Sequence, residues 1–419
     1  MICDCGEADE IGLHKLKFTA KIMILISDAL EIIEKNVGKL SLEKVEIADS
    51  CGRVLAEEIR ADMDLPPFNR SQMDGFAVKV KDTKNAPIKL KIVGESSAGK
   101  GFNGKIKTGE AVRIMTGARI PDGADAVQKV ELTDESESFI TILEPTKLQQ
   151  HIVKRAEEIE KGAKIFKIGE IITARKIATL ASFGYAEVKV AKKPNVAILA
   201  TGSEIVLITE TPQKDQIRNS NSIMLKVFAE KYADVQIFPI VKDELENLKS
   251  GIKKALESCD VLIISGGVSI GDYDFTKPAL RELGAEIFFE KVSLRPGKPT
   301  VFAKLNDKLI FGLPGNPVSV AVTFYLFVRT ALLKMQNAAD CQLKQGFAVA
   351  SAKIKGAKER DSFLPVKIET AKDGKFIIES VRFSGSSNFI AFANANALAF
   401  VPQGETYANG DVVKIAYLP

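Results

Sequence analysis

The segment that most constrains the fold is an apolar run that passes into a glycine-rich loop and then into a helical pattern. Val261–Ile264 is short, continuous and apolar, which is typical of a buried parallel strand. The loop reads SGGVSIGDYD at residues 265–274, and a helical pattern follows from about Phe275 to Leu283. A strand, a glycine loop and a helix in this order present backbone N–H groups and a positive helix end to an anion.

Two carboxylates, those of Asp272 and Asp274, lie inside this loop. Carboxylates repel a bare phosphate, so we expect the loop to meet its anion through a divalent cation that prefers oxygen ligands. The combination predicts an enzyme that acts on a phosphorylated or oxyanionic substrate.

The region around this loop alternates strand-like runs with helical patterns, which predicts a doubly wound, mostly parallel sheet. The expected strands are Val196–Ala200, Val235–Val241, Val261–Ile264, Glu286–Phe289, Val301–Leu305 and Leu309–Phe311, and Pro317–Leu333 is an expected apolar helix. We expect Asp243 to cap a helix that extends to about Ser258, with Glu246 three residues later as in a capping box. Ligands of such sheets bind at the carboxyl ends of the strands.

The flanking regions differ from this pattern. Residues 22–33 carry apolar side chains at helical spacing and predict an amphipathic helix. Residues 87–145 contain short strand-like runs separated by glycine turns, which predicts a compact β-rich module. Residues 341–419 return to β patterns and predict a separate small β domain. A length of 419 residues is consistent with roughly three domains.

Composition argues against several classes of protein. The net charge of +4 is small against 58 basic and 54 acidic residues, so we expect neither a nucleic-acid partner nor a membrane partner. The apolar run at residues 22–26 is too short to span a bilayer. Five cysteines without framework spacing indicate a reducing compartment, so we expect a cytoplasmic protein. With His14 and His151 as the two histidines, general base and metal-binding roles fall to carboxylates.

Several turn-rich loops follow predicted strands and are expected at one edge of the sheet. They are Thr201–Glu204, residues 265–274, Arg295–Pro299 and Leu313–Pro317. Three acids and three bases would meet there: Glu204, Asp243, Asp274, Lys291, Arg295 and Lys298. Hard cations bind such carboxylates, and lysine and arginine compensate the negative charge of an anionic substrate.

Four of these six residues, and the glycines of the loops, also have a structural interpretation. Asp243 could act as an N-cap worth about 1 kcal/mol, and Glu204 could be a solvated turn residue. Lys291 and Arg295 could belong to an exposed strand face. The glycines could serve backbone geometry alone: Gly266, Gly267 and Gly315.

Two further segments combine glycine turns with polar side chains. The first is PPFNRSQMDGFA at residues 66–77, and the second is IMTGARIPDGADAV at residues 114–127. Tight turns explain the glycines of both segments. They explain Asp74 and Thr116 less well, so these two residues are candidates for a functional role.

Taken together, these segments resemble the MoeA family, the molybdopterin molybdenumtransferases, which also include the E domain of gephyrin. The matching runs are PPFNRSQMDGFA at 66–77, IMTGARIPDGADAVQKVE at 114–131, SGGVSIGDYDFTKPAL at 265–280, LRPGKP at 294–299 and GLPGNPVS at 312–319. The resemblance covers nearly everything after about residue 20, and its motifs are long and keep their order along the chain.

The resemblance implies a multidomain chain that combines α/β and β domains and forms an elongated homodimer. The implied domains are an extended linker domain (36–60 and 162–190), an inserted β-rich domain (61–161), an α/β molybdopterin-binding domain (20–35 and 191–337) and a C-terminal β-barrel-like domain (338–419). The implied reaction inserts molybdenum from molybdate into adenylylated molybdopterin, releases AMP and requires Mg²⁺. The implied active site lies between the α/β domain of one subunit and the inserted domain of the other.

The resemblance also implies roles for individual residues. Catalytic roles fall to Asp74, Thr116, Glu204, Asp243 and Asp274, of which Glu204, Asp243 and Asp274 would hold the metal. Substrate or anion binding falls to Gly266, Gly267, Ser269, Lys291, Arg295, Lys298, Arg155, Pro314 and Pro317. Arg155 aligns loosely, Ser203 replaces an acid of the family's TGDE run, and Asn219 stands where aspartate is common.

Other functions remain open at the level of sequence. A molybdopterin adenylyltransferase is the nearest alternative enzyme, because the α/β region resembles that fold as well, but the additional β domains argue against it. A scaffold or binding protein like gephyrin, or a pterin carrier without chemistry, are alternatives of a different class. Contact with the adenylyltransferase that acts upstream is a further expectation.

Overall fold

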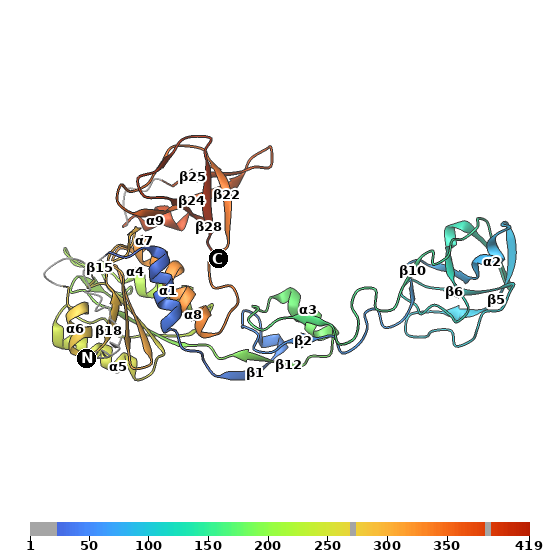
Figure 1. Cartoon of the computed structure of the whole chain (residues 1–419), viewed down its shortest axis with the longest axis horizontal. Coiled ribbons are helices and arrows are strands. Elements are labelled where there is room, and N and C mark those ends of the chain that lie inside the picture. The colour runs from blue at the N-terminus through green and yellow to red at the C-terminus, as the bar shows by residue number, and fades with distance from the viewer. Residues whose placement is uncertain (1–22, 269–273, 382–386) are drawn as a thin grey trace, which may run out of the picture.

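The computed structural model describes residues 23–268, 274–381 and 387–419. Ser269 and Asp272, which the sequence places in the glycine loop, lie outside the described residues. The molecule is elongated, with an α/β domain at one end, a β-rich inserted domain at the other, and a narrow linker between them (Figure 1). The C-terminal β domain lies beside the α/β domain (Figure 1).

A six-stranded sheet forms the centre of the α/β domain, in the order β16-β13-β17-β21-β20-β18. The strands are β13 (Asn195–Ala200), β16 (Asp234–Ile237), β17 (Val261–Ser265), β18 (Glu286–Phe289), β20 (Val301–Leu305) and β21 (Lys308–Leu313). The first four strands in the sheet order are parallel, and β20 and β18 add antiparallel pairings. This confirms the doubly wound, mostly parallel sheet.

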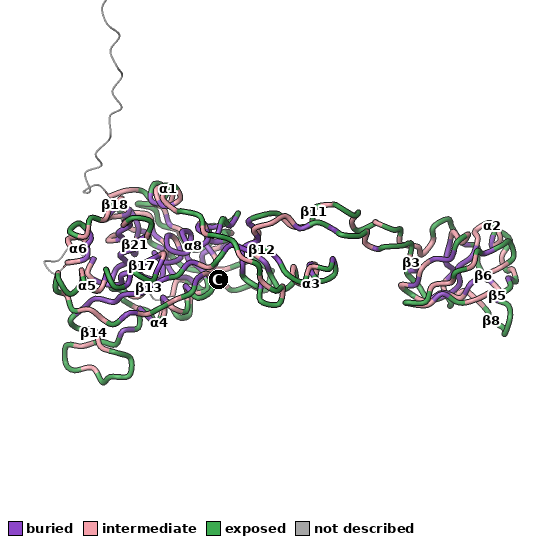
Figure 2. The backbone as a smooth tube through the Cα atoms, turned by 90° about the horizontal axis from the view of Figure 1, so that it is seen from below, coloured by how far each residue is buried: buried purple, intermediate pink, exposed green. Residues whose placement is uncertain are grey.

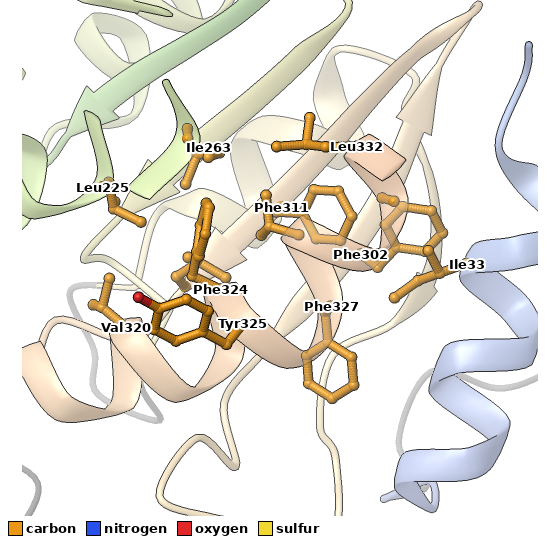
Figure 3. Close-up of a cluster of buried hydrophobic side chains, with 14 of the residues drawn as sticks. Ile33, Leu225, Ile263, Phe302, Phe311, Val320, Phe324, Tyr325, Phe327 and Leu332 are labelled. Carbon is orange, nitrogen blue, oxygen red and sulfur yellow. The ribbon is translucent and has the colours of Figure 1, made fainter. Parts of the chain in front are cut away.

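Alternate residues of the buried strands face opposite sides of the sheet, so each face supports its own hydrophobic core. Ile198 and Ile263 belong to one core, and Leu199 and Ile264 belong to the other. The first core packs against α1 (Ile26–Asn36), α4 (Ser220–Ala229), α7 (Pro317–Thr323), the π-helical segment η3 (Phe324–Val328) and α8 (Arg329–Met335). The second packs against α5 (Leu245–Leu256) and α6 (Thr276–Glu282). Figure 3 shows aromatic rings such as Phe302, Phe311 and Phe324 filling the first core.

The long apolar helix Pro317–Met335 has the length and composition of a membrane-spanning segment. However, 89% of its most apolar window is buried inside the protein, which is typical of the core helix of a globular domain. The sequence predicts this helix, and the structure adds the π-helical segment in its middle.

The linker consists of two chain passages that pair in antiparallel fashion. The pairs are β1 (Leu42–Glu46) with β12 (Glu187–Ala191) and β2 (Ile59–Arg60) with β11 (Lys164–Phe166), accompanied by η1 (Ile47–Asp49) and α3 (Ala174–Ser182). A small core that includes Leu55, Leu180 and Val188 stabilises this region. Because one passage leads out and the other returns, the inserted domain lies at a distance from the sheet (Figures 1 and 2).

The inserted domain contains a six-stranded sheet in the order β7-β4-β6-β5-β9-β8. Its strands are β4 (Gly75–Val78), β5 (Ile88–Ser96), β6 (Glu110–Ile114), β7 (Ala126–Lys129), β8 (Thr133–Ser136) and β9 (Phe139–Ile142). The smaller elements are β3 (Arg70–Ser71), α2 (Val80–Thr83), η2 (Val130–Leu132) and β10 (Ile152–Val153). The compact β-rich module expected at residues 87–145 is therefore present, and it extends back to β4.

The C-terminal domain is a closed barrel, because β24 pairs with both β25 and β26 in the sheet order β24-β25-β22-β28-β26. Its elements are β22 (Gln345–Ala350), β23 (Ile354–Lys355), β24 (Asp361–Thr370), β25 (Phe376–Ser380), α9 (Phe389–Ala393), β26 (Ala397–Val401), β27 (Thr406–Tyr407) and β28 (Val412–Tyr417). β19 (Leu294–Arg295) leaves the α/β domain and pairs with β24, which ties the two domains together. The residue boundaries of the four domains stay predictions.

Two expectations about local structure need correction. The first helix begins at Ile26 and not at residue 22, because Ile24 forms a parallel bridge with Val292 and is therefore extended. The strand expected at Val235–Val241 ends at Ile237.

Candidate functional site

A cavity of about 840 Å³ lies at the carboxyl edge of the central sheet. Its walls come from the loops after β13, β17 and β21, from β14 (Ile205–Val206), β15 (Ile217–Arg218) and the following residues, and from residues 387–389. Several of the predicted site residues line it: Glu204, Asp243, Gly266, Gly267, Pro314 and Pro317. The loops that the sequence places at one edge of the sheet therefore enclose a common space.

Backbone hydrogen bonds hold the strand ends side by side. The Thr201 N–H donates to the carbonyl oxygen of Ser265 at 3.1 Å, and the Gly266 N–H donates to that of Leu313 at 3.2 Å. Thr201 also forms a parallel bridge with Val241, beyond the end of β16. These bonds extend the sheet into the loops, so the rim is a continuation of a rigid element.

The two glycines after β17 are required by the backbone. Gly266 has a φ of +101°, and a Cβ there would lie 2.3 Å from the carbonyl oxygen of Thr201. Gly267 has a φ of +61°, and its Cβ would lie 2.9 Å from Thr276 Oγ1. Residues with a side chain rarely adopt such φ values, and here the space is also occupied. The structural role of these glycines is therefore real, and it coexists with their place in the cavity wall.

Asp243 faces the neighbouring loop and does not cap a helix. Thr201 Oγ1 donates a hydrogen bond to Asp243 Oδ1 at 2.5 Å. Helix α5 begins at Leu245, Glu244 occupies its N-cap position, and no side-chain capping hydrogen bond is formed there. The N-cap interpretation of Asp243, with its capping box to Glu246, is therefore wrong. One carboxylate oxygen of Asp243 is instead held by Thr201 at the cavity wall.

Glu204 lines the same cavity from the loop after β13, and its side chain is exposed. Its backbone carbonyl accepts a hydrogen bond from the Ile217 N–H at 2.9 Å, which fixes the loop to β15. Ser203, the departure from the family pattern, is exposed beside it.

Asp274, the last residue of the glycine loop, is almost fully buried, with a side-chain exposure of 7%. Its Oδ2 lies 2.5 Å from Lys277 Nζ, so this buried carboxylate is paired with a lysine. Burial raises the pKa of this carboxyl, and Lys277 opposes that rise. The described lining of the cavity does not include Asp274.

The predicted metal ligands do not form a closed cluster. Within residues 23–268, 274–381 and 387–419, no three or more His, Cys, Asp or Glu side chains lie close enough together to hold a metal ion. A site assembled from Glu204, Asp243 and Asp274 alone is thus not preformed in the described part of the chain.

The three predicted bases are half-buried close to one another along the chain: Lys291, Arg295 and Lys298. The adjacent Pro299 lines the cavity, although the bases themselves do not. Among the described residues, none of the three forms an ion pair with an acid. A half-buried cation without an acidic partner favours the binding of an anion.

Asn221 and Phe389 are among the lining residues that the sequence does not single out. The side-chain amide of Asn221 donates to Gly315 O at 2.7 Å and to Ser265 Oγ at 3.2 Å, so it joins two of the loops. Phe389 reaches the cavity from the C-terminal domain. The position of Asn221 at the start of α4 was a usable signal. Phe389 had none, because nothing in the local sequence indicates that α9 reaches another domain.

Asn219, which stands where aspartate is common in the family, keeps a local structural role. Its side-chain oxygen accepts from the Ser222 N–H at 3.1 Å, so Asn219 is the N-cap of α4. Asparagine and aspartate cap helices about equally well. The substitution therefore preserves the local geometry.

A second group of predicted residues lies in the inserted domain. Asp74 Oδ1 accepts hydrogen bonds from the Thr116 N–H at 2.6 Å and from Thr116 Oγ1 at 2.8 Å. These bonds lower the pKa of Asp74, with the backbone bond contributing most. Gly75 must follow Asp74, because a Cβ there would lie 2.0 Å from the carbonyl oxygen of Gln128. The motif therefore fixes an ionised carboxylate on an exposed surface.

Arg155 belongs to this end of the molecule as well. Its Nε donates to Asp64 Oδ2 at 2.5 Å, and its N–H donates to Asn69 Oδ1 at 2.8 Å. Arg155 thus joins the two chain passages where the inserted domain begins, and its guanidinium is mostly exposed. The inserted domain lies at the opposite end of the molecule from the α/β domain, so Asp74, Thr116 and Arg155 do not reach the cavity of their own chain (Figure 1).

Three family models match the chain in order. They are the MoeA N-terminal region (domain I and II) at residues 24–184, the probable molybdopterin binding domain at 197–334 and the MoeA C-terminal region (domain IV) at 348–418. Together they span the linker, the inserted domain, the α/β domain and the barrel.

Relatives and solved structures agree with these models. The chain is 36% identical over 386 residues to the molybdopterin molybdenumtransferase of Staphylococcus aureus strain COL, covering 91% of this chain and 92% of that protein. It is 35% identical over 398 residues to that of Staphylococcus epidermidis, covering 94% and 95%. The crystal structure of the molybdopterin biosynthesis moeA protein from Pyrococcus horikoshii OT3 matches with a TM-score of 0.81 and 29% identity, over 95% of this chain and 100% of that one. Because three successive models agree with relatives that match over nine tenths of both chains, the chain belongs to the MoeA family.

Proposed function

We propose that the protein is a molybdopterin molybdenumtransferase that inserts molybdenum from molybdate into adenylylated molybdopterin and releases AMP. The curated relatives carry the name of this activity over nine tenths of the chain. The observation that carries the proposal is the cavity at the strand ends, whose walls are loops suited to an anion. Pro299 in its lining follows the half-buried base Lys298, which has no acidic partner among the described residues. Such a site suits a substrate that carries several negative charges.

The charges of the two substrates explain why both acids and bases are needed. The pyrophosphate group and molybdate repel each other, so bringing them together requires positive charge at the site. Lys291, Arg295 and Lys298 would receive the molybdate oxygens, with help from Ser269 in the glycine loop. The N–H groups of Gly267 and Gly315 would hold the phosphates, in loops shaped by Gly266, Pro314 and Pro317, because the Gly266 N–H donates to Leu313 and proline has no N–H.

Mg²⁺ suits the oxygen-rich side of this cavity. Asp243 and Glu204 both line it, whereas Asp274, whose Oδ2 lies 2.5 Å from Lys277 Nζ, would have to join them from outside the described lining. A Mg²⁺ site commonly combines one or two carboxylates with substrate phosphates, so the lack of a closed three-acid cluster is compatible with it. When bound, the ion would polarise the phosphoanhydride as a Lewis acid. Thr201 would keep Asp243 in the orientation that faces the phosphates.

We propose a reaction with the following balance. The two dithiolene thiols replace two molybdate oxygens, which take up the two thiol protons and two protons from solvent and leave as two waters, while molybdenum keeps its oxidation state. Water attacks the pterin-side phosphorus of the phosphoanhydride and gives up a proton to solvent, and AMP departs with the bridging oxygen. The residues of the chain position both substrates and compensate their charge; none forms a covalent bond to them.

We also propose that the site is shared between two subunits of a homodimer. Asp74 and Thr116 are fixed in an exposed position, and the length of the linker separates them from the cavity of their own chain (Figure 1). A second copy could supply them to that cavity, where they would order the pterin side of the substrate, and Arg155 would accompany them. A cytoplasmic location and contact with the upstream adenylyltransferase belong to the same proposal.

The deciding experiment measures AMP release from adenylylated molybdopterin with molybdate and Mg²⁺. We expect release that depends on molybdate, and a loss of about a hundredfold or more in Asp243→Asn, which removes a charge from the cavity. Glu244→Gln is the matched control, because it changes the next acid along the chain, which does not line the cavity. Adenylylation of molybdopterin from ATP, without molybdenum insertion, would favour the adenylyltransferase alternative and contradict the proposal.

A further inference from the structure

One wall of the cavity comes from a different domain. Ser387 and Phe389 line the cavity from the C-terminal domain, and Phe389 is the one aromatic residue among its described lining residues. The Phe389 side chain is large and apolar, yet the residue is 51% exposed. Exposed aromatic residues beside a polar binding site are often there for a ligand.

The helix that carries Phe389 is anchored from two sides. Asn388 caps α9 by accepting a hydrogen bond from the Ala391 N–H at 3.2 Å. Phe392 packs against the core of the α/β domain, and α9 contacts α7 as well as β24. The exposed ring is therefore presented by a fixed element, which keeps the entropic cost of using it as a contact surface low.

The cavity also has polar surface, and this surface lies at the strand ends. The strand ends line the cavity with small or polar residues such as Ser265, Gly267 and Gly315, whereas Phe389 and Ile217 add apolar surface to the same cavity. Ile217 is 59% exposed, and it belongs to the β14–β15 segment that projects from the α/β domain (Figure 2). A polar floor and partly apolar walls match a molecule in which a phosphate is attached to a flat heteroaromatic ring.

We propose that Phe389 is a substrate-positioning contact that stacks on the heteroaromatic ring of the bound substrate. The inference rests on the proposed function, because that substrate carries two such rings, the adenine and the pterin. Stacking on an aromatic side chain is available to both, since each has a π-face. The ring of Phe389 would set the direction in which the phosphates enter the glycine loops.

The experiment compares phosphorylated ligands that have a heteroaromatic ring with one that has none. AMP, ribose 5-phosphate and neopterin monophosphate are titrated by calorimetry into the full-length protein and into Phe389→Leu, which keeps an apolar side chain but removes the ring. Ile390→Ala is the matched control, because Ile390 lies next along α9, is 70% exposed and is not among the described residues that line the cavity. Phe389→Tyr keeps the π-face and should bind like the wild type.

We expect Phe389→Leu to weaken binding of AMP or of the phosphorylated pterin about tenfold, and to leave ribose 5-phosphate nearly unchanged. A loss for AMP would assign the adenine, and a loss for the pterin would assign the pterin. Equal affinities in wild type and Phe389→Leu, or an equal loss for ribose 5-phosphate, would overturn the stacking role and leave the proposed function standing. If the wild type bound none of the three probes, the proposed function would fail, and this inference with it.

Discussion

The cavity of the α/β domain and the Asp74–Thr116 pair of the inserted domain differ in shape and in exposure. The cavity is concave, and several loops and a second domain enclose it. The pair is exposed, and Asp74 Oδ1 is already held by two hydrogen bonds from Thr116. The first region leaves space for a ligand, and the second presents a fixed charge to something outside its own domain.

Under the proposed function, this difference would assign substrate binding to the cavity and a fixed charge to the Asp74–Thr116 pair of another subunit. A carboxylate that Thr116 holds rigidly on an exposed surface needs no reorganisation to act on a neighbour. The linker, with its own small core, keeps that carboxylate far from the cavity of the same chain. If both regions serve one reaction, they meet between two copies.

The largest expected effect comes from mutating the two regions in different subunits and then mixing the subunits. Asp74→Asn and Asp243→Asn should each reduce AMP release about a hundredfold or more as homodimers, because each variant spoils every site. Mixed in equal amounts with subunit exchange, they should restore about a quarter of the wild-type activity, since half of the dimers then contain one intact site out of two.

Size-exclusion chromatography and far-UV circular dichroism verify that each variant is folded and dimeric before mixing. Two variants of the same region, Asp243→Asn and Glu204→Gln, serve as the control mixture and should not complement. Absence of recovery in the first mixture, with exchange demonstrated by a tag, would show that the two regions do not share a site.

The next effect concerns the rigidity of the cavity. Gly266→Ala places a Cβ 2.3 Å from the carbonyl oxygen of Thr201 at a φ of +101°, so the loop must move. We expect a loss of about 1–3 kcal/mol in the free energy of unfolding and at least about tenfold lower activity. Urea denaturation and AMP release measure the two. Gly315→Ala is the control for stability, because the nearest atom to its Cβ would lie 4.0 Å away. Equal stability of both variants would argue against a strained loop.

Most loops that line the cavity were predictable from sequence, because each loop is marked by residues that are neighbours along the chain. Glycines and prolines directly after apolar runs mark loops at strand ends, and a parallel sheet gathers those ends at one edge. Asp243 was misread as a cap because its real partner, Thr201, lies 42 residues away along the chain. Phe389 was missed because its position depends on the packing of one domain against another. Such long-range contacts leave no local signal in a single sequence.

A smaller effect tests how Asp243 is oriented. Thr201→Val removes the hydroxyl that donates to Asp243 Oδ1, while keeping the shape of this buried side chain. We expect the Mg²⁺ concentration for half-maximal activity to rise about tenfold, as is usual when a residue that orients a metal ligand is lost. Thr201→Ser keeps the hydroxyl and should behave like the wild type. An unchanged Mg²⁺ dependence in Thr201→Val would separate Asp243 from the metal.

The smallest effect tests the other region, through the pKa of Asp74. The Thr116 hydrogen bonds hold this pKa below its ordinary value of 3.8, so their contribution to stability is present above that value and is lost as the pH falls through the lowered pKa. Thr116→Val removes the side-chain bond but keeps the backbone N–H, which is the larger cause. The pKa of Asp74, followed by NMR titration, should therefore rise part of the way toward its ordinary value, and Thr116→Ser should not change it. A full return of the pKa to its ordinary value would mean that the backbone hydrogen bond depends on the Thr116 hydroxyl. The Asp74 carboxylate would then be held less rigidly than the residues of the cavity that it is proposed to complete.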